Sequence, residues 1–371
     1  MMGSRFLIVL LAFFASLAYV VWHLWRITPG GWVLKLTAAG LFLLWMALAF
    51  AGFGLTERVP VRTATVLYEA GHPWLIAFLY LLLVFFLADV ASLCRLLPKS
   101  LLRDSAAGLW SVLGLTAVIL MAGSIHYRHK YREEMTIQTE KPLDKPLTVV
   151  LASDLHIGYH NRKAELGRWM DLFNAEHPDL VLIGGDIIDR SIRPVLEGDY
   201  AAEFRRLDAP VWTILGNHEY YSDEAAAERF FEASGIHLLR DEVRDFSGIR
   251  VIGRDDRTNP RRKSLSELAD TSDRFTILLD HQPYRLEEAE RAGVDFQFSG
   301  HTHHGQVWPV SWVTDALFEK AWGPHQRGRT QYYVSSGIGI WGPKIRIGTR
   351  SEYLVLHIVP RYAFCSPGAA N

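Results

Sequence analysis

The sequence has little cysteine and almost no net charge. Two cysteines among 371 residues, Cys94 and Cys365, exclude a disulfide framework and a cysteine-rich zinc module. A formal net charge of −1 excludes a strongly basic nucleic-acid binder, so we expect no nucleic-acid partner. Hydrophobic residues make up 49% and charged residues 21%, which are ordinary values for a globular protein.

This ordinary average conceals an N-terminal third in which charged residues are scarce. Residues 1–125 contain eight Lys or Arg and four Asp or Glu. The rest of the chain carries charge at a density typical of water-soluble domains. The sequence therefore predicts two regions that face different solvents.

The N-terminal region is apolar enough to cross a membrane several times. A helix needs about 20 apolar residues to span the hydrocarbon core of a bilayer. A cleaved signal peptide would explain only the first of four such segments, so we expect a four-helix transmembrane region over residues 1–125. The segments are Phe6–Trp25, Trp32–Gly54, Trp74–Leu97 and Ser105–Ile125.

The basic residues that flank these segments indicate an orientation. Four spans place both ends of the region on one side of the membrane. The flanks on that side hold six basic residues and the opposite flanks hold four, so the positive-inside rule favours a cytoplasmic C-terminal domain. The six are Arg5, Arg58, Arg62, Arg128, Lys130 and Arg132; the four are Arg26, Arg95, Lys99 and Arg103.

The C-terminal region alternates strand-like and helix-like patterns, which predicts a layered α/β fold. We expect residues 126–146 to be a juxtamembrane linker, residues 147–360 to be the domain and residues 361–371 to be a disordered tail. The expected strands are Leu147–Ser153, Asp179–Gly184, Val211–Leu215, Ile249–Gly253, Phe275–Leu279, Val294–Ser299, Gln331–Ser335 and Tyr353–Val359. The expected helices are Lys163–Asn174, Val195–Leu207, Asp223–Ser234 and Arg285–Arg291.

Asp, Asn or His residues follow five of the first six expected strands. Ligands of α/β sheets bind beyond the carboxyl ends of the strands, so these residues form a candidate site. The five motifs are Asp154-Leu155-His156, Gly185-Asp186-Ile187-Ile188-Asp189, Gly216-Asn217-His218-Glu219, His281 and Gly300-His301-Thr302-His303.

Imidazole and carboxylate groups in these motifs suit Mn, Fe or Zn. If the strands continue as extended chain, Asp154 and His156 point to the same side, and so do His301 and His303. A carboxylate such as that of Asp186 can bridge two cations that together clamp a phosphoryl group. Glycines before three motifs let the backbone approach a crowded site.

The five motifs, in this order and approximate spacing, resemble the signature of calcineurin-like metallophosphoesterases over roughly residues 147–358. Residues 300–306 and 333–339, with Arg346 and Arg350, resemble a membrane-associated bacterial branch that contains phosphodiesterases and UDP-diacylglucosamine-pyrophosphatase-like enzymes. The resemblance implies a βαβα sandwich domain and a location in the bacterial plasma (inner) membrane.

The resemblance also implies roles for residues. Two divalent ions are expected, with Mn favoured and Fe, Zn or Mg left open, and a hydroxide between them would attack phosphorus. His218 would protonate the leaving oxygen or stabilise phosphoryl charge, and Asp189 would orient His218 or its loop. One ion would be held by Asp154, His156, Asp186 and His303, and the other by Asp186, Asn217, His281 and His301.

Several residues around the motifs carry weaker expectations. His304 contacts substrate or points away from the site. Arg262 belongs to a basic loop that binds a phosphate or is simply solvated. Asn161 is expected to cap the next helix. Four tryptophans after the paired histidines either enter the membrane interface or pack in the core, namely Trp308, Trp312, Trp322 and Trp341.

Taken together, these features predict a membrane-anchored phosphoesterase that hydrolyses a phosphodiester or pyrophosphate. A phosphate-ester or nucleotide-linked lipid is the expected substrate and membrane lipids are the expected partners, because a membrane anchor suits a substrate in the bilayer. The alternative is a non-catalytic metal- or phosphate-binding regulatory domain on a membrane protein or transporter. Asp89 is the only acidic residue deep in a span, which disfavours a transporter. The oligomeric state is left open.

Overall fold

The computed structural model describes residues 2–269 and 273–361, with side chains described from Phe6 onward. The chain divides into two compact units, residues 1–125 and 126–371. Of the expected disordered tail, residues 362–371 lie outside the described part.

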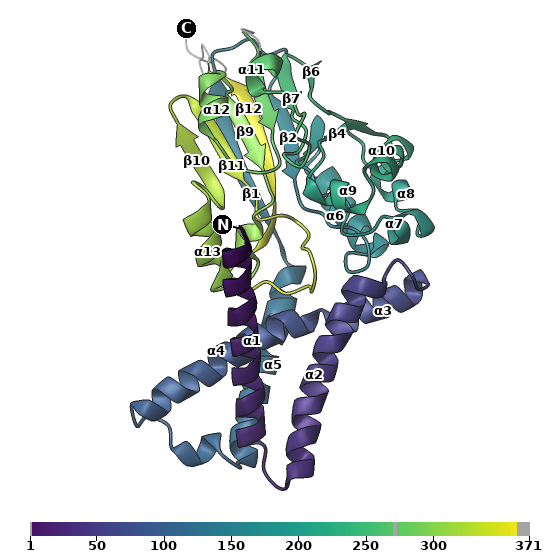
Figure 1. The fold of residues 1–371 in the computed structure, drawn as a ribbon. Helices are drawn as coiled ribbons and strands as arrows, with labels where there is room; N and C mark the ends of the chain where they lie inside the picture. Colours follow the sequence, from purple (N-terminus) through teal and green to yellow (C-terminus); the bar gives the residue numbers. More distant parts are fainter. Residues whose placement is uncertain (1, 270–272, 362–371) are drawn as a thin grey trace, which may run out of the picture. The chain divides into compact units, whose positions relative to one another are not determined.

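The N-terminal unit is helical, as expected (Figure 1). Four helical stretches are long and apolar enough to cross a membrane: Phe6–Ile27, Trp32–Leu55, Val61–Leu93 and Ala106–Arg128. The third includes an additional short helix that precedes the predicted span. The elements are α1 (Met2–Ile27), α2 (Trp32–Leu55), α3 (Val61–Gly71), α4 (Pro73–Leu93), η1 (Lys99–Leu102) and α5 (Ala106–Arg128).

Asp89, the acidic residue inside the predicted span Trp74–Leu97, is paired with polar groups of α1. Its Oδ2 accepts a hydrogen bond of 2.7 Å from the Tyr19 hydroxyl and lies 3.0 Å from Nε2 of His23. His23 is buried and stacks on Phe85. A carboxylate in an apolar segment is costly unless it is paired, and here it ties α4 to α1.

The C-terminal unit contains two six-stranded sheets, which confirms the predicted layered α/β class (Figure 1). The first has the order β1 (Lys130–Thr139), β12 (Ser351–Pro360), β2 (Leu147–Ala152), β3 (Leu180–Ile183), β4 (Val211–Thr213) and β5 (Ile236–Leu238). The second has the order β10 (Gly323–Arg327), β11 (Thr330–Val334), β9 (Phe296–Ser299), β8 (Phe275–Leu279), β7 (Ile249–Gly253) and β6 (Glu242–Phe246). Strands β2 to β5 are mutually parallel, and so are β7, β8, β9 and β11.

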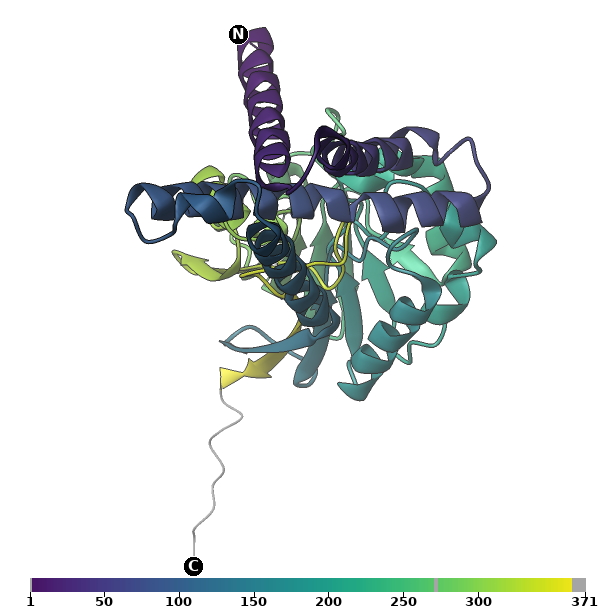
Figure 2. The ribbon, with the colours of Figure 1, turned by 90° about the horizontal axis from the view of Figure 1, so that it is seen from below.

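Alternating side chains of the strands build the layers. Val150 of β2 packs with the helices on the outer face of the first sheet, whereas its neighbours Val149 and Leu151 pack against the second sheet. Figure 2 shows the teal helices of the first half-domain along that outer face. They are α6 (Lys163–Ala175), α7 (Arg193–Glu197), α8 (Ala201–Phe204), α9 (Asn217–Ser222) and α10 (Glu224–Ala233). Helices α11 (Leu265–Leu268) and α12 (Glu287–Arg291) cover the second sheet.

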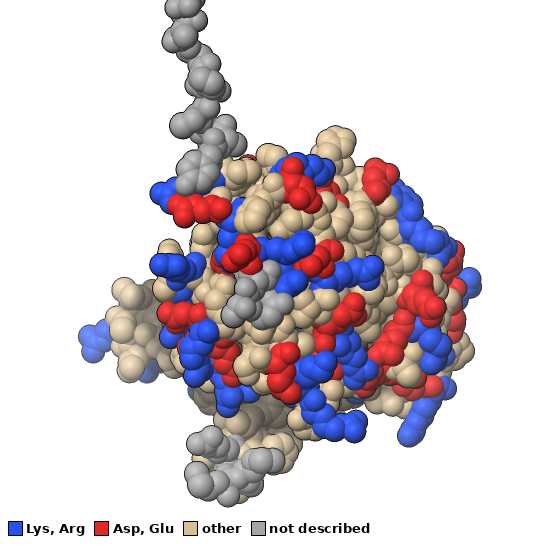
Figure 3. Space-filling model, turned by 90° about the horizontal axis from the view of Figure 1, so that it is seen from above, with Lys and Arg blue, Asp and Glu red and all other residues tan. Residues whose placement is uncertain are grey.

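Seen from above, the C-terminal unit bears basic and acidic side chains interspersed over its surface (Figure 3). Mixed charge of this kind is typical of a surface that faces water. The view supports the assignment of the charge-rich part of the sequence to an aqueous domain.

Two expectations about the elements of the C-terminal unit were wrong. The expected linker 126–146 contains strand β1, which pairs in parallel with β12 along its full length. Its polar, edge-strand sequence lacks the apolar run by which the inner strands were recognised. The expected helix Val195–Leu207 is instead two short helices, α7 and α8, because Asp199 between them adopts a left-handed φ of 49°.

Candidate metal centre

All seven predicted metal ligands come together where the two sheets end. Asp154 and His156 follow β2, Asp186 follows β3, and Asn217 begins α9 just after β4. The remaining three follow strands of the second sheet: His281 follows β8, His301 follows β9, and His303 begins the short turn η2 (His303–Gly305). Residues far apart in the sequence therefore meet at one edge, as the strand-end argument predicts.

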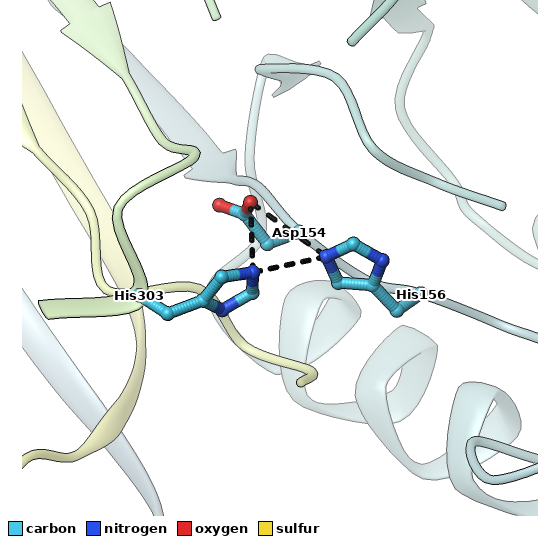
Figure 4. Close-up of side chains that lie close together, drawn as sticks. All are labelled: Asp154, His156 and His303. Atoms are coloured by element: carbon cyan, nitrogen blue, oxygen red, sulfur yellow. Dashed lines mark hydrogen bonds and ion pairs between the residues drawn. The ribbon is translucent and has the colours of Figure 1, made fainter. Parts of the chain in front are cut away.

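One group of potential ligands consists of Asp154, His156 and His303 (Figure 4). The Nε2 atoms of the two histidines lie 3.0 Å apart, and Asp154 Oδ1 lies 3.4 Å from Nε2 of His303 and 3.8 Å from Nε2 of His156. All three residues are buried. Figure 4 shows both rings and the carboxylate directed at one point.

A second group consists of Asp186, His281 and His301. Asp186 Oδ2 lies 3.1 Å from Nε2 of His281 and 3.7 Å from Nε2 of His156, so one oxygen stands between the two groups. Asn217 joins the second group, because its Oδ1 lies 2.8 Å from Nδ1 of His301. This is the placement that a carboxylate shared by two cations requires.

The donor atoms fit divalent cations. His281 donates from Nδ1 to the carbonyl of Gly184 over 2.7 Å, which leaves Nε2 buried without a hydrogen-bond partner. The paired Nε2 atoms of His156 and His303 also suit a shared cation, because two nitrogens bound at about 2.1 Å can lie 3.0 Å apart. Hydrogen bonding to a ligand ring on its far side, as in His281, fixes both tautomer and orientation.

The electrostatics of the centre also favour cations. Burial acts to raise the pKa of Asp186, but nearby His281 and His218 hold it well below its usual value. The same opposition of burial and histidine neighbours, chiefly His303, leaves the pKa of Asp154 lowered. Both buried carboxylates are therefore anionic at neutral pH, which is costly in a protein interior without positive charge nearby.

The backbone conformation that produces this arrangement differs from the extended chain that the sequence predicts. Asp154 and His156 do not continue β2 as extended chain; they have left-handed φ values of 55° and 44°. Asp186, His301 and His303 also have positive φ. The predicted convergence is present, but turns rather than strand alternation produce it, and non-glycine residues in this conformation are concentrated at functional sites.

Close approach of the backbone explains two of the glycines. A Cβ on Gly300 would lie 2.3 Å from Oδ2 of Asp154, and one on Gly216 would lie 2.2 Å from Oδ1 of Asp186. Neither contact is tolerable for a side chain that must stay fixed. These glycines therefore protect the positions of two carboxylates.

The two residues predicted to be catalytic lie beside the first group. Asp189 Oδ1 is 3.6 Å from Nδ1 of both His218 and His156. Burial is the main cause that lowers the pKa of His218 to about 4 and raises that of Asp189 to about 6. The His218 side chain remains 15% exposed, so it faces the open side of the centre.

Sequence reasoning gave Glu219 no role, yet it organises the centre. Its buried carboxylate accepts hydrogen bonds from the backbone N–H groups of Asp186, Ile188 and Gly216 at 3.1, 2.9 and 2.7 Å. Burial raises its pKa to about 7. Glu219 thereby joins the turn after β3 to the turn after β4. The available signal was a Glu three residues after Gly216, where its carboxylate can accept from the backbone N–H at the start of a helix.

Asn161 is also a support residue rather than the expected helix cap. Its side-chain NH₂ donates to the carbonyls of Leu155, His156 and Ile340, and its Oδ1 accepts from the Tyr127 hydroxyl. The position before α6 that would cap it belongs to Arg162.

Arg346 lies fully buried on the other side of the centre. It donates to the carbonyls of His303, Ser336 and Gly339. A guanidinium has enough N–H groups to hold several carbonyls at once. Arg346 therefore fixes the backbone of the ligand His303 against the segment after β11.

The two residues expected to bind substrate are placed differently from each other. His304 stacks on Trp322 and helps to line a cavity of about 250 Å³ together with His126, Tyr131, Gly348, Thr349 and Arg350. Arg262 instead donates to Asp280 over 3.1 Å and to the carbonyl of Asp255. Arg262 therefore stabilises the segment that carries His281, whereas His304 borders an open space.

The sequence over this region is similar to a phosphoesterase family and to proteins described as metallophosphoesterases. Residues 147–305 match the family model for calcineurin-like phosphoesterases. An uncharacterized metallophosphoesterase of Helicobacter pylori J99 is 31% identical over 237 residues, which cover 62% of this chain and 64% of that protein. An Aquifex aeolicus protein with the same description is 29% identical over 240 residues, or 61% of this chain and 90% of its own.

A transmembrane relative also matches. The Danio rerio transmembrane protein with metallophosphoesterase domain is 27% identical over 309 residues, which cover 74% of this chain and 70% of that protein. The match to the Helicobacter relative spans less than two thirds of that relative's length. Residues 147–305 thus match the calcineurin-like phosphoesterase family by sequence, and the motifs of that match converge in the structure.

Proposed function

We propose that this protein is a membrane-anchored, metal-dependent hydrolase of a phosphodiester or pyrophosphate in a lipid-linked substrate. The observation that carries the proposal is the position of Asp186 Oδ2 between His156 and His281. A site built only to hold one structural ion needs no oxygen shared by two groups of ligands. Two metals placed 3.5–4 Å apart are typical of phosphoryl-transfer sites.

The residues of the chain have three roles in this proposal: they hold the metal ions, act on the phosphoryl group, and support the ligands. Bound divalent ions would supply a nucleophilic water and neutralise charge on the phosphoryl group. Asp154, His156, Asp186, Asn217, His281, His301 and His303 would hold them. His218 donates a hydrogen bond to the phosphoryl group or to the leaving oxygen, and Asp189 orients the His218 ring from Nδ1. Glu219 and Arg346 keep the ligand backbones in place.

The architecture supports the proposal of a lipid-linked substrate. The chain combines the site with four helices apolar enough to cross a membrane, and the cavity beside His304 is lined by His126 in the last turn of α5. This open, partly aromatic space has His126 on its lining together with His304, the residue next to the proposed ligand His303. In this proposal, a lipid-linked phosphate ester approaches the metal centre from the side of this cavity.

Hydrolysis by the purified full chain tests the proposal. The protein in detergent with Mn²⁺ is assayed on an aryl phosphodiester and on a pyrophosphate-linked lipid, alongside Asp186→Asn and the exposed control Asp199→Asn. We expect turnover in the wild type and the control and loss in Asp186→Asn. Metal binding without turnover on any phosphate ester or pyrophosphate would instead support the regulatory-domain alternative.

We also propose that the domain lies on the cytoplasmic side of a bacterial plasma membrane. The basic flanks of the predicted spans support this orientation. Because β1 begins two residues after α5, a reporter inserted within residues 126–146 would break the domain. A reporter fused after Asn371 avoids this problem. Activity of an enzyme reporter that works only outside the cytoplasm would contradict the orientation.

A further inference from the structure

The helix that follows the paired histidines exposes an unusual amount of apolar surface. Helix α13 (Val310–Leu317) comes directly after η2, which carries His303. We define the α13 surface as Trp308, Trp312, Val313 and Leu317, which are 39%, 64%, 55% and 69% exposed. Large apolar side chains gathered on one exposed face mark interaction sites.

The α13 surface is held in place rather than loosely attached. The rings of Trp308 and Trp312 lie edge to face with centroids 5.3 Å apart. Ser311 on the inner side of the helix is buried, and a Cβ on Gly305 would lie 2.5 Å from the Ser311 backbone nitrogen. The helix is therefore packed tightly on the turn that carries His303, while its apolar residues face outward.

The surface is continuous with the end of a membrane segment. In the last turn of α5, Nε2 of His126 lies 3.0 Å from the carbonyl oxygen of Thr349. The Thr349 hydroxyl donates to the Gln306 carbonyl over 2.6 Å, and the backbone N–H of Trp308 donates to the Ile347 carbonyl over 2.6 Å. Two short segments thus join α5 to the start of the α13 surface.

We propose that the α13 surface inserts into the interfacial layer of the membrane in which α5 is embedded. Indole rings prefer the bilayer interface, and an exposed apolar helix face gains free energy by burial at the boundary between headgroups and acyl chains. The lipid surface is the occupant favoured here because these hydrogen bonds connect the α13 surface to His126, in the last turn of a helix apolar enough to cross a membrane. This inference rests on the membrane embedding in the proposed function and identifies how a lipid-linked phosphate ester is brought beside His303 and His304.

Lipid quenching of a fluorophore tests the insertion without requiring catalysis. The full chain with Cys94→Ala and Cys365→Ala is placed in nanodiscs of phosphatidylcholine and phosphatidylglycerol, and a polarity-sensitive label is attached at Leu317→Cys. The matched control carries the label at Leu196→Cys, an apolar position on α7 that is 56% exposed. In one arm the phosphatidylcholine is brominated near the headgroup end of its acyl chains.

We expect a blue-shifted emission and quenching by brominated lipid at residue 317, and neither at residue 196. Equal behaviour at the two positions, or a lack of quenching at both, would overturn the proposal and leave a protein partner or a second copy of the chain as the occupant. Quenching at residue 317 in a protein without hydrolytic activity would support the membrane contact and contradict the proposed function.

A kinetic comparison addresses the consequence for substrate. Leu317→Asp is expected to raise KM for a phosphodiester lipid in vesicles about tenfold, as expected from the loss of one buried apolar side chain. The same variant should leave hydrolysis of a water-soluble aryl phosphodiester unchanged. Leu196→Asp serves as the control, and equal losses on both substrates in Leu317→Asp would indicate a folding defect and contradict a role in membrane contact.

Discussion

Oδ2 of Asp186 lies 3.1 Å from Nε2 of His281, a histidine that arrives from the other sheet. The same oxygen is 3.7 Å from Nε2 of His156, which follows β2. The carboxylate therefore joins ligands from both halves of the domain at the sheet edge. Its backbone N–H is held by Glu219, and its Oδ1 accepts from the backbone N–H of His218 over 2.9 Å. The proposed metal chemistry therefore depends on Asp186.

Removal of the charge at this residue should abolish function with little effect on the fold. Asp186→Asn keeps the size of the side chain and its acceptor for His218, but it removes the anionic oxygen between His156 and His281. We expect Mn²⁺ affinity to fall at least about tenfold, a loss typical of weakened metal sites. Titration calorimetry measures the affinity, and thermal unfolding should remain close to that of Asp199→Asn. Unchanged Mn²⁺ affinity would contradict the assignment.

His218 should affect turnover more than metal binding. Its ring lies beside His156 and groups with His156 and Asp189, but it belongs to neither of the groups that contain Asp154 or Asp186. His218→Ala is expected to lower kcat by roughly 10²–10⁴-fold, the usual range for loss of a proton-transferring side chain. The control is His304→Ala, which should act on KM for the lipid substrate. A loss of bound metal equal to that of Asp186→Asn would show that His218 is a ligand instead.

Glu219 provides a test of structural support. Glu219→Ala leaves three buried N–H groups without acceptor, and each such group costs about 1–3 kcal/mol. The melting temperature should therefore fall markedly. Glu219→Gln retains one acceptor oxygen and should lose less. The exposed Glu232→Ala on α10 is the control for removal of a carboxylate. Equal melting temperatures of Glu219→Ala and this control would refute the structural role of Glu219.

Arg346 should stabilise the segment that carries His303. Arg346→Met fills much of the same volume but leaves the carbonyls of His303, Ser336 and Gly339 without their donor. We expect the free energy of unfolding to fall by several kcal/mol, because each buried polar group left without its partner costs about 1–3 kcal/mol. Chemical denaturation measures this loss, and the exposed Arg329→Met should show none. Equal stability of the two variants would contradict the role.

Much of the fold was predictable because the inner strands are short apolar runs. Ile249–Gly253 and Phe275–Leu279 were predicted with the bounds observed, and both are buried between layers. Strand β1 was missed because its exposed side carries Arg132 and Glu134, and an edge strand needs only one apolar face. The helix break at Asp199 was missed because a positive φ at Asp leaves little trace in a periodicity pattern.

The candidate site was predictable as a set of residues but not as a geometry. The carboxyl ends of parallel strands meet at one edge of a sheet, so Asp154 and Asp186 could be grouped from sequence order. His281 follows a strand of the other sheet, and its meeting with them depends on how the two sheets pack. The left-handed turns that aim Asp154 and His156 could not be read from the sequence. Nor could the contacts of Glu219, because hydrogen bonds to the backbone of distant turns depend on the assembled fold.

The proposed dinuclear centre is tested most directly by the Mn²⁺ stoichiometry of the purified full chain. Titration calorimetry measures it, together with elemental analysis after removal of free metal. We predict two bound ions per chain in the wild type and in Asp199→Asn, and fewer in Asp186→Asn. One ion or none in the wild type, under conditions in which the protein is folded, would contradict a dinuclear centre built on Asp186.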